Sequence, residues 1–192
     1  VEDFRSPSQE LVNLEDSYAK AYRKFVKGMR DGKMSTILYP DANSTLRLTY
    51  GTVIPLAKDK RNPDVKKNYY TTFNTLIAKY KKDDPEFDMS QRMLDLYQNK
   101  EFGRYIDKDG SMHVNFLTNN DITGGNSGSP VMNGKGELIG LAFDGNIEAM
   151  AGDVIFDKKL QRTINVDIRY VLWVIDIYAN AKNIINEIET VQ

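Results

Sequence analysis

The feature that most constrains the fold is a series of short β-type segments that begins after residue 113. Each is rich in β-branched or aromatic residues and bounded by glycine, asparagine or aspartate, which is typical of strands. The tetrapeptide NGKG at 133–136 predicts a hairpin turn, because asparagine and glycine both tolerate positive φ. The second half of the chain is therefore expected to form a β-rich core from five segments: 114–118, 129–133, 137–144, 153–157 and 162–166.

Helical segments flank this part of the chain. Apolar residues that recur every three or four positions predict amphipathic helices at 8–32, 88–102 and 166–188. Ser90 is the expected cap of the second helix, and Asn165 or Asp167 that of the third. Apolar and polar residues alternate at 46–50, which predicts one further strand ahead of the core.

Composition excludes several classes of function. The 26 basic and 27 acidic residues give a net charge of -1, so a nucleic-acid partner is not expected. Cysteine is absent, which removes disulfides, thiol nucleophiles and zinc–thiolate sites. The only histidine is His113, so the chain cannot build a multi-histidine metal site, and neither a metal nor a cofactor is expected. Apolar runs are too short for a transmembrane helix.

One motif carries chemistry, TGGNSGSP at 123–130. A serine nucleophile needs a base and needs donors for the oxyanion, and glycines let two backbone N–H groups point into one small hole. The N–H groups of Gly125 and Ser127 fit that role, with Ser127 Oγ beside them. The α/β-hydrolase elbow requires glycine two residues after the serine, where this chain has Ser129, so that template is disfavoured. A chymotrypsin-type turn followed by strands fits, and a glycine-rich surface turn is the alternative.

The base for such a nucleophile is missing from the expected place. His113 lies fourteen residues before Ser127. In chymotrypsin-like folds the histidine is far upstream, on the other barrel. His113 is therefore expected to be a surface or strand-end residue, and no acid can be singled out as its partner.

The motifs resemble the bacterial dipeptidyl peptidase 7 and 11 family. The similarity covers about residues 38–192 and rests on TGGNSGSP, GELIGLAFDGN and the LQRTI and VDIRYVL stretches. The family's fold is a chymotrypsin-like double barrel split by a helical insertion, with the catalytic histidine and aspartate in the N-terminal half. The resemblance implies that this chain is mostly β with flanking helices. Residues 1–37 would end the helical domain, and 38–192 would form the C-terminal barrel half with the nucleophile and a closing helix.

The resemblance also assigns roles to residues. Ser127 matches the nucleophile, and Gly125 and Ser127 match the oxyanion-hole amides. Gly145 matches the position that sorts the family by substrate, where aspartate/glutamate-specific members carry arginine. Glycine there implies a hydrophobic preference, with the adjoining Phe143 and Asp144 also lining the substrate site. The alternative for Gly145 is an ordinary turn glycine.

The expected function is a serine-type dipeptidyl aminopeptidase that releases dipeptides from peptide N-termini. This chain alone is expected to be inactive, because its histidine and aspartate would come from the N-terminal half of the same enzyme. Its partners would be an oligopeptide substrate and that half, and an exposed apolar face also allows a homodimer. Periplasm or cell surface of a Gram-negative bacterium is the location that the resemblance implies. Two alternatives stay open: a non-catalytic β-barrel binding module, and a complete trypsin-like endopeptidase that uses His113.

Overall fold

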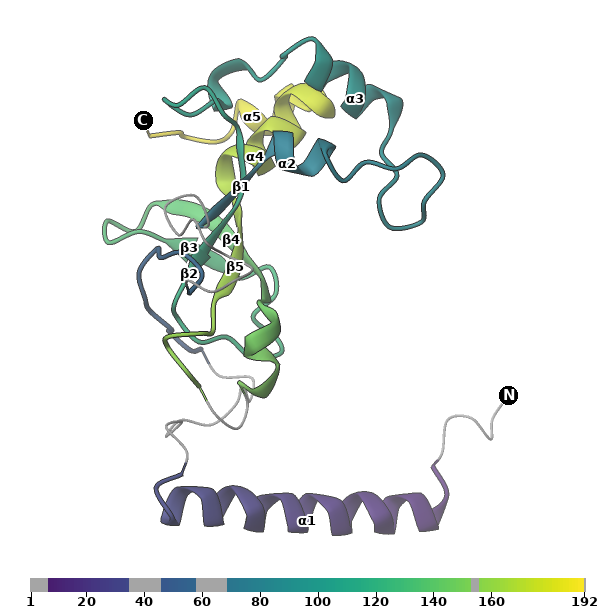
Figure 1. Ribbon diagram of the computed structural model, residues 1–192, viewed down its shortest axis with the longest axis vertical. Helices are drawn as coiled ribbons and strands as arrows, with labels where there is room; N and C mark the ends of the chain where they lie inside the picture. The colour runs from purple at the N-terminus through teal and green to yellow at the C-terminus, as the bar shows by residue number, and fades with distance from the viewer. Residues whose placement is uncertain (1–6, 35–45, 58–68, 153–155, 192) are drawn as a thin grey trace.

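A five-stranded antiparallel sheet lies at the centre of the molecule (Figure 1). The computed structural model describes residues 7–34, 46–57, 69–152 and 156–191. The strand order is β1-β2-β5-β4-β3. The strands are β1 (Tyr70–Thr72), β2 (His113–Thr118), β3 (Pro130–Met132), β4 (Leu138–Gly145) and β5 (Thr163–Asp167).

Four of the five predicted core strands are confirmed as β2 to β5, and the hairpin turn between β3 and β4 is confirmed as well. In that turn the Gly136 N–H donates to the Asn133 carbonyl at 3.0 Å, and Gly136 has a φ of 82°. The left-handed φ explains why a glycine stands there. Most of the segment predicted at 153–157 lies outside the described residues.

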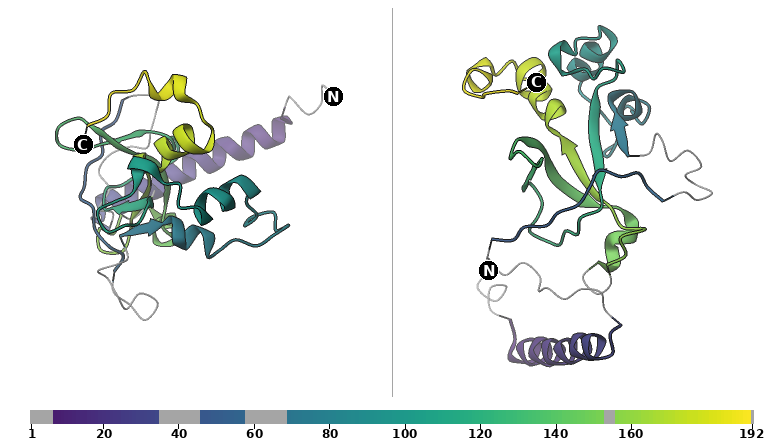
Figure 2. Two further views of the ribbon diagram at one scale, coloured as in Figure 1. Left: turned by 90° about the horizontal axis from the view of Figure 1, so that it is seen from above. Right: turned by 90° about the vertical axis from the view of Figure 1, so that its left-hand side faces the viewer.

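The predicted first helix is α1 (Gln9–Asp31), capped by Ser8 and followed by Gly32. Ser8 Oγ accepts the Leu11 N–H at 3.2 Å, which satisfies one of the free donors of the first turn. None of the residues of α1 is buried, so its apolar stripe has no cover within the described part of the chain. Figure 1 and the right-hand view of Figure 2 show α1 apart from the sheet.

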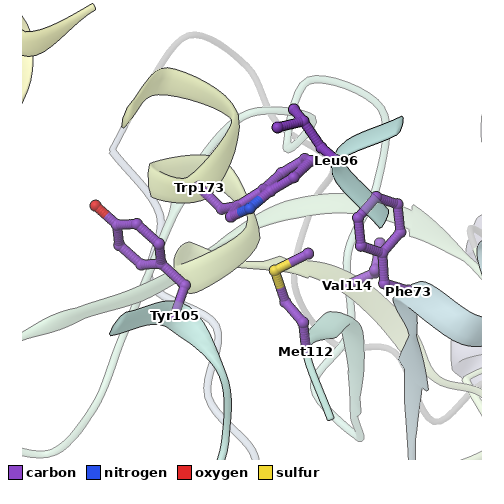
Figure 3. Close-up of a cluster of buried hydrophobic side chains, with 6 residues drawn as sticks. All are labelled: Phe73, Leu96, Tyr105, Met112, Val114 and Trp173. Carbon is purple, nitrogen blue, oxygen red and sulfur yellow. The ribbon is translucent and has the colours of Figure 1, made fainter. Parts of the chain in front are cut away.

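The other α-helices, with η2, gather at one end of the sheet (Figure 1). Their main elements are α2 (Phe73–Ile77), α3 (Gln91–Gln98), η2 (Gly103–Tyr105) and α4 (Ile168–Trp173). The hydrophobic core lies there, around the fully buried Trp173 (Figure 3). The Trp173 Nε1–H donates to the Glu101 carbonyl at 2.8 Å, so this ring is buried without an unpaired donor. The cluster consists of Phe73, Leu96, Tyr105, Met112, Val114 and Trp173.

Two predictions about elements need correction. The helix predicted at 166–188 begins after its cap Asp167 but is broken into α4, a π-helical turn η4 (Val174–Tyr178) and α5 (Lys182–Ile185). Asn180 has a φ of 52°, a left-handed conformation that ends a helix. Apolar spacing continues across the break, which is why the sequence predicted one helix.

The strand predicted at 46–50 is wrong. Residues 46–50 have no regular secondary structure, and the side chains of Leu46, Leu48 and Tyr50 are 102%, 91% and 88% exposed. Only the following residues join the sheet, where Val53 forms an isolated bridge with Thr118. Alternation predicts a strand only when a partner strand accepts the backbone hydrogen bonds, and none of the described residues does so here.

The expected fold class is confirmed in its coarser form, a sheet with flanking helices. The described strands form a sheet with β1 and β3 at its edges, and the barrel half stays a prediction. The expected boundary at residue 37 lies outside the described residues. Within the described ranges, no helix has the length and hydropathy needed to cross a membrane.

Candidate active site

Ser127 lies on an exposed turn between β2 and β3. The turn is closed by a reciprocal pair of hydrogen bonds: the Thr123 N–H donates to Asn126 Oδ1 at 2.9 Å, and the Asn126 N–H donates to the Thr123 carbonyl at 3.2 Å. Gly125 and Gly128 have φ of 95° and 81°, in the left-handed region that favours glycine. The two glycines of the motif therefore stand where the backbone needs them.

The two N–H groups predicted for an oxyanion hole are available. Gly125 and Ser127 are exposed, and within the described ranges neither of their N–H groups donates a hydrogen bond. The neighbouring Gly128 N–H, by contrast, is held by the Ala142 carbonyl at 2.7 Å. Free, fixed donors beside a serine hydroxyl are what oxyanion stabilisation requires.

Strand β4 brings the predicted substrate-binding residues to the serine. Ser127 Oγ lies 3.5 Å from the Phe143 carbonyl oxygen. Phe143 is the extra residue of a β-bulge, because Ala142 pairs with Asn165 whereas Asp144 already pairs with Ile164. A bulge redirects a side chain, and the Phe143 ring is 57% exposed.

Asp144 is exposed beside this bulge, and its Oδ1 accepts the Gly145 N–H at 2.8 Å. Gly145 itself is the last residue of β4 and does not have a positive φ. A glycine is needed for a different reason: a Cβ at this position would lie 2.7 Å from Ala149 Cβ. Ala149 belongs to η3 (Ile147–Ala151), a 3-10 turn that packs directly against Gly145. Steric contact, rather than turn conformation, thus accounts for Gly145.

Sequence reasoning missed the hydrogen-bonded residues that fix the chain just after Gly145. Asn146 Oδ1 accepts the Arg162 N–H at 2.7 Å, and the Asn146 N–H donates to the Arg162 carbonyl at 3.0 Å. Asn146 adjoins a predicted site residue, but Arg162 is seventeen positions after Gly145 in the sequence. Only the pairing of β4 with β5 brings the two together, so local sequence held no signal for Arg162.

His113 is held elsewhere. Its ring stacks on Tyr70 with centroids 3.9 Å apart, and its Nδ1 lies 3.1 Å from Arg169 Nη2. A guanidinium can only donate, so Nδ1 accepts and a neutral ring carries its proton on Nε2. Nε2 lies 3.8 Å from Asp109 Oδ2 and has no hydrogen-bond partner in the part of the chain that the structure describes. Among the described residues, the ring of His113 contacts Tyr70, Arg169 and Asp109 and not Ser127, which disfavours the complete endopeptidase as an alternative.

The described residues contain no group of three or more histidine, aspartate or glutamate side chains that could hold a metal ion. The groups at Ser127 are the backbone amides of its own turn and the Phe143 carbonyl oxygen. They suit a nucleophilic attack on a carbonyl group whose base is supplied from outside the described residues.

Comparison with protein families matches residues 2–190 to the peptidase S46 model. The chain belongs to the peptidase S46 family. An S46 relative, Dipeptidyl-peptidase 7 of Capnocytophaga gingivalis, is 74% identical over 179 residues, which cover 93% of this chain and 25% of that protein. The Asp/Glu-specific dipeptidyl-peptidase of the same organism is 44% identical, over 93% of this chain and 24% of the relative.

Solved S46 structures share the fold. DPP11 of Porphyromonas endodontalis in complex with the dipeptide Arg-Glu has a TM-score of 0.77 at 38% identity, over 93% of this chain and 25% of that structure. The chain thus spans about a quarter of the length of the S46 proteins that it matches.

Proposed function

We propose that this chain is the nucleophile-bearing, C-terminal portion of a serine-type dipeptidyl peptidase. The observation that carries the proposal is the turn at 123–128, where an exposed serine hydroxyl adjoins two backbone N–H groups that donate no hydrogen bond to any described residue. Membership of the S46 family supports a peptidase, and a related structure holds a dipeptide. The alternative of a non-catalytic binding module gives no reason for those N–H groups to be kept free.

The proposed reaction begins with attack of Ser127 Oγ on the carbonyl carbon of the second peptide bond. A base takes the hydroxyl proton, and the negative charge that develops on the carbonyl oxygen is held by the N–H groups of Gly125 and Ser127. The C–N bond then breaks, the base returns the proton to the leaving amine, and an acyl-enzyme with the dipeptide on Ser127 forms. Water activated by the same base hydrolyses that ester and frees the dipeptide.

The base and its orienting carboxylate are assigned to the N-terminal half of the same enzyme. His113, the only histidine of the chain, is bound to Arg169 and Tyr70 instead of Ser127. The relatives are about four times as long as this chain, which leaves ample length for that half. Periplasm or cell surface is the proposed location, and cell fractionation with an antibody to the protein tests it.

We further propose a hydrophobic preference for the second residue of the peptide. Gly145 leaves the predicted side-chain pocket without a positive charge, and the exposed Phe143 ring offers an apolar surface next to it. The higher identity to a Dipeptidyl-peptidase 7 than to an Asp/Glu-specific enzyme of the same organism is in line with this preference. Dipeptidyl substrates that differ only in the second residue test it directly.

The decisive experiment replaces the nucleophile in the whole enzyme. Ser127→Ala should lower kcat/KM by at least about 10⁴-fold, the order of loss seen when a serine nucleophile is removed. The mutant should also lose covalent labelling by a fluorophosphonate. Ser129→Ala is the matched control, because Ser129 contributes only backbone bonds to Asn126 and Ala142. Undiminished cleavage by the Ser127→Ala variant would contradict the proposal.

A further inference from the structure

Arg162 is a buried cation whose place in the proposed reaction is unassigned. Arg162 is only 5% exposed. Burial lowers the pKa of its guanidinium, although the nearby carboxylates of Asp157 and Glu148 act in the opposite direction. Burying a guanidinium is costly unless its donors are bonded. Among the described residues, four of its five N–H donors are bonded, all to backbone carbonyls: Pro55 at 2.8 Å, Lys158 at 3.0 Å, Lys159 at 3.1 Å and Gln161 at 2.6 Å.

The backbone of Arg162 is bound in turn to Asn146, and every polar group of Asn146 is used. Its N–H and Oδ1 bond the Arg162 carbonyl and N–H, and its carbonyl accepts the Ala149 N–H at 2.8 Å. Its Nδ2 donates to Glu148 Oε2 at 2.7 Å and to the Leu160 carbonyl at 2.9 Å. Arg162 and Asn146 therefore form one bonded unit, which is called the clamp below.

The clamp fixes the turn that limits space at Gly145. Asn146 is the N-cap residue of η3. Gln161 also binds this turn, because its Nε2–H donates to the Glu148 carbonyl at 3.1 Å. Ala149 of the same turn occupies the space that a side chain at residue 145 would need. The distance between η3 and β4 thus depends on the clamp, and so does the shape of any pocket at Gly145.

We propose that Asn146 and Arg162 are positioning residues that set the size of the side chain accepted at the second residue of the substrate. This inference rests on the proposed function. Neither residue needs to touch the peptide: the clamp holds η3 against β4, and the fixed turn forms one wall of the pocket. A rigid apolar pocket discriminates between side chains that differ by a methylene by about 10- to 200-fold, and a mobile wall loses that discrimination.

The test uses the whole enzyme and a substrate series with alanine, valine, leucine or phenylalanine as the second residue. Asn146→Ala removes the bonds to Arg162 N–H, Glu148 and Leu160, and Arg162→Lys replaces four directed bonds by a single ammonium. In both variants the ratio of kcat/KM between the best and the worst substrate should fall by about tenfold, mainly through KM. Labelling of Ser127 by a small fluorophosphonate should stay within about threefold of wild type, because the nucleophile turn is untouched.

Two matched control variants lie away from Gly145. Arg92 also donates to backbone carbonyls, those of Tyr178 at 2.7 Å and Ile177 at 3.1 Å, at the helical end of the sheet. Asn133 uses its side chain in the β3–β4 hairpin turn, bonding Lys135 and Glu137. Arg92→Lys and Asn133→Ala should leave the substrate ratio unchanged.

The outcomes separate the inference from the proposed function. A wild-type enzyme that releases no dipeptide overturns the proposed function. If the wild type is active but the clamp variants keep the wild-type ratio of kcat/KM between the best and the worst substrate, the inference is overturned. Equal loss on every substrate together with lost labelling also overturns it, since that result indicates only structural damage. Should Arg162→Lys fail to fold, as judged by thermal unfolding, Asn146→Ala decides alone.

Discussion

At the scale of single residues, Asn126 is predicted to stabilise the conformation of the turn that holds Ser127. Its Oδ1 accepts the Thr123 N–H, and this bond holds Gly125 in its left-handed conformation. Asn126→Ala should lower kcat by about tenfold, the value of one net hydrogen bond, and should lower the melting temperature slightly. Steady-state kinetics and thermal unfolding measure the two effects. Asn126→Asp keeps an acceptor and should restore the melting temperature of wild type. If Asn126→Ala has the same melting temperature as wild type, the Asn126 side chain does not stabilise the turn.

Gly145 gives a second prediction at this scale. Gly145→Ala should destabilise the protein by about 1–3 kcal/mol, because its Cβ would lie 2.7 Å from Ala149 Cβ. In an Ala149→Gly background that contact is absent, and the same substitution should cost little. Urea unfolding of the four proteins in this double-mutant cycle measures the coupling. A cost that is the same in both backgrounds would contradict the steric explanation.

At the residue level, local chemistry was sufficient to predict a turn at Ser127. Glycines and a serine within one short segment set the turn conformation themselves, and among the described residues the N–H groups of Gly125 and Ser127 donate no hydrogen bond. The catalytic roles of these residues stay a prediction. The sequence could not reveal Arg162 or the contact of Gly145 with Ala149. Both depend on how β4 pairs with β5 and on where η3 folds back, which only tertiary structure determines.

At the scale of elements, an ion pair joins the turn before β2 to the start of α4. Arg169 Nη1 donates to Asp107 Oδ2 at 2.6 Å, and this guanidinium holds the pKa of the Asp107 carboxyl below its usual value. A depressed carboxyl pKa adds stability above the unfolded value of about 3.9, and this stability is lost as pH falls through the folded pKa.

Asp107→Asn should therefore destabilise the protein by about 1 kcal/mol at pH 7 and by less at pH 3. Urea unfolding at the two pH values is the measurement. Asp16→Asn, on the exposed surface of α1, removes a carboxylate that forms no ion pair with the described residues and serves as the control for net charge. A loss of stability from Asp107→Asn that is as large at pH 3 as at pH 7 would refute the assignment.

Elements were predictable where a periodic pattern coincided with a boundary signal. Ser8 and Gly32 delimit α1, Ser90 caps α3, and Asp167 caps α4. The break after η4 was missed because Asn180 interrupts the backbone without interrupting the apolar spacing. At 46–50 the pattern was present, but a strand also needs a neighbour, and a pattern within one segment cannot supply it.

At the scale of the whole molecule, two apolar surfaces lack cover within the described residues. One is Leu46, Leu48 and Tyr50, and the other is the stripe along α1, of which Leu14 and Tyr18 are 61% and 71% exposed. Contiguous apolar surface of this kind drives association. The isolated chain should therefore self-associate. It should also show no dipeptidyl peptidase activity, because the proposed base for Ser127 belongs to the N-terminal half of the enzyme.

Light scattering and a fluorogenic dipeptidyl substrate check the two halves of this prediction. Changing Leu46, Leu48 and Tyr50 together to serine should reduce association if that segment is one of the surfaces responsible. A monodisperse monomer with dipeptidyl activity abolished by Ser127→Ala would overturn both the association and the missing base. The homodimer expected for the whole enzyme stays a prediction, which sedimentation of the full-length protein can test.

The arrangement of the sheet also bears on how such an enzyme could diversify. The aromatic core lies beside α4, which follows Asp167, whereas Gly145 pairs with Thr163 at the opposite end of β5. Residues 123–149 hold the proposed nucleophile turn, the β3–β4 hairpin and the proposed pocket wall at Gly145, and none of them belongs to the Trp173 cluster. Substitutions in this segment can therefore change the substrate preference of the enzyme without removing contacts of the hydrophobic core. Selectivity can evolve here at little cost in folding stability.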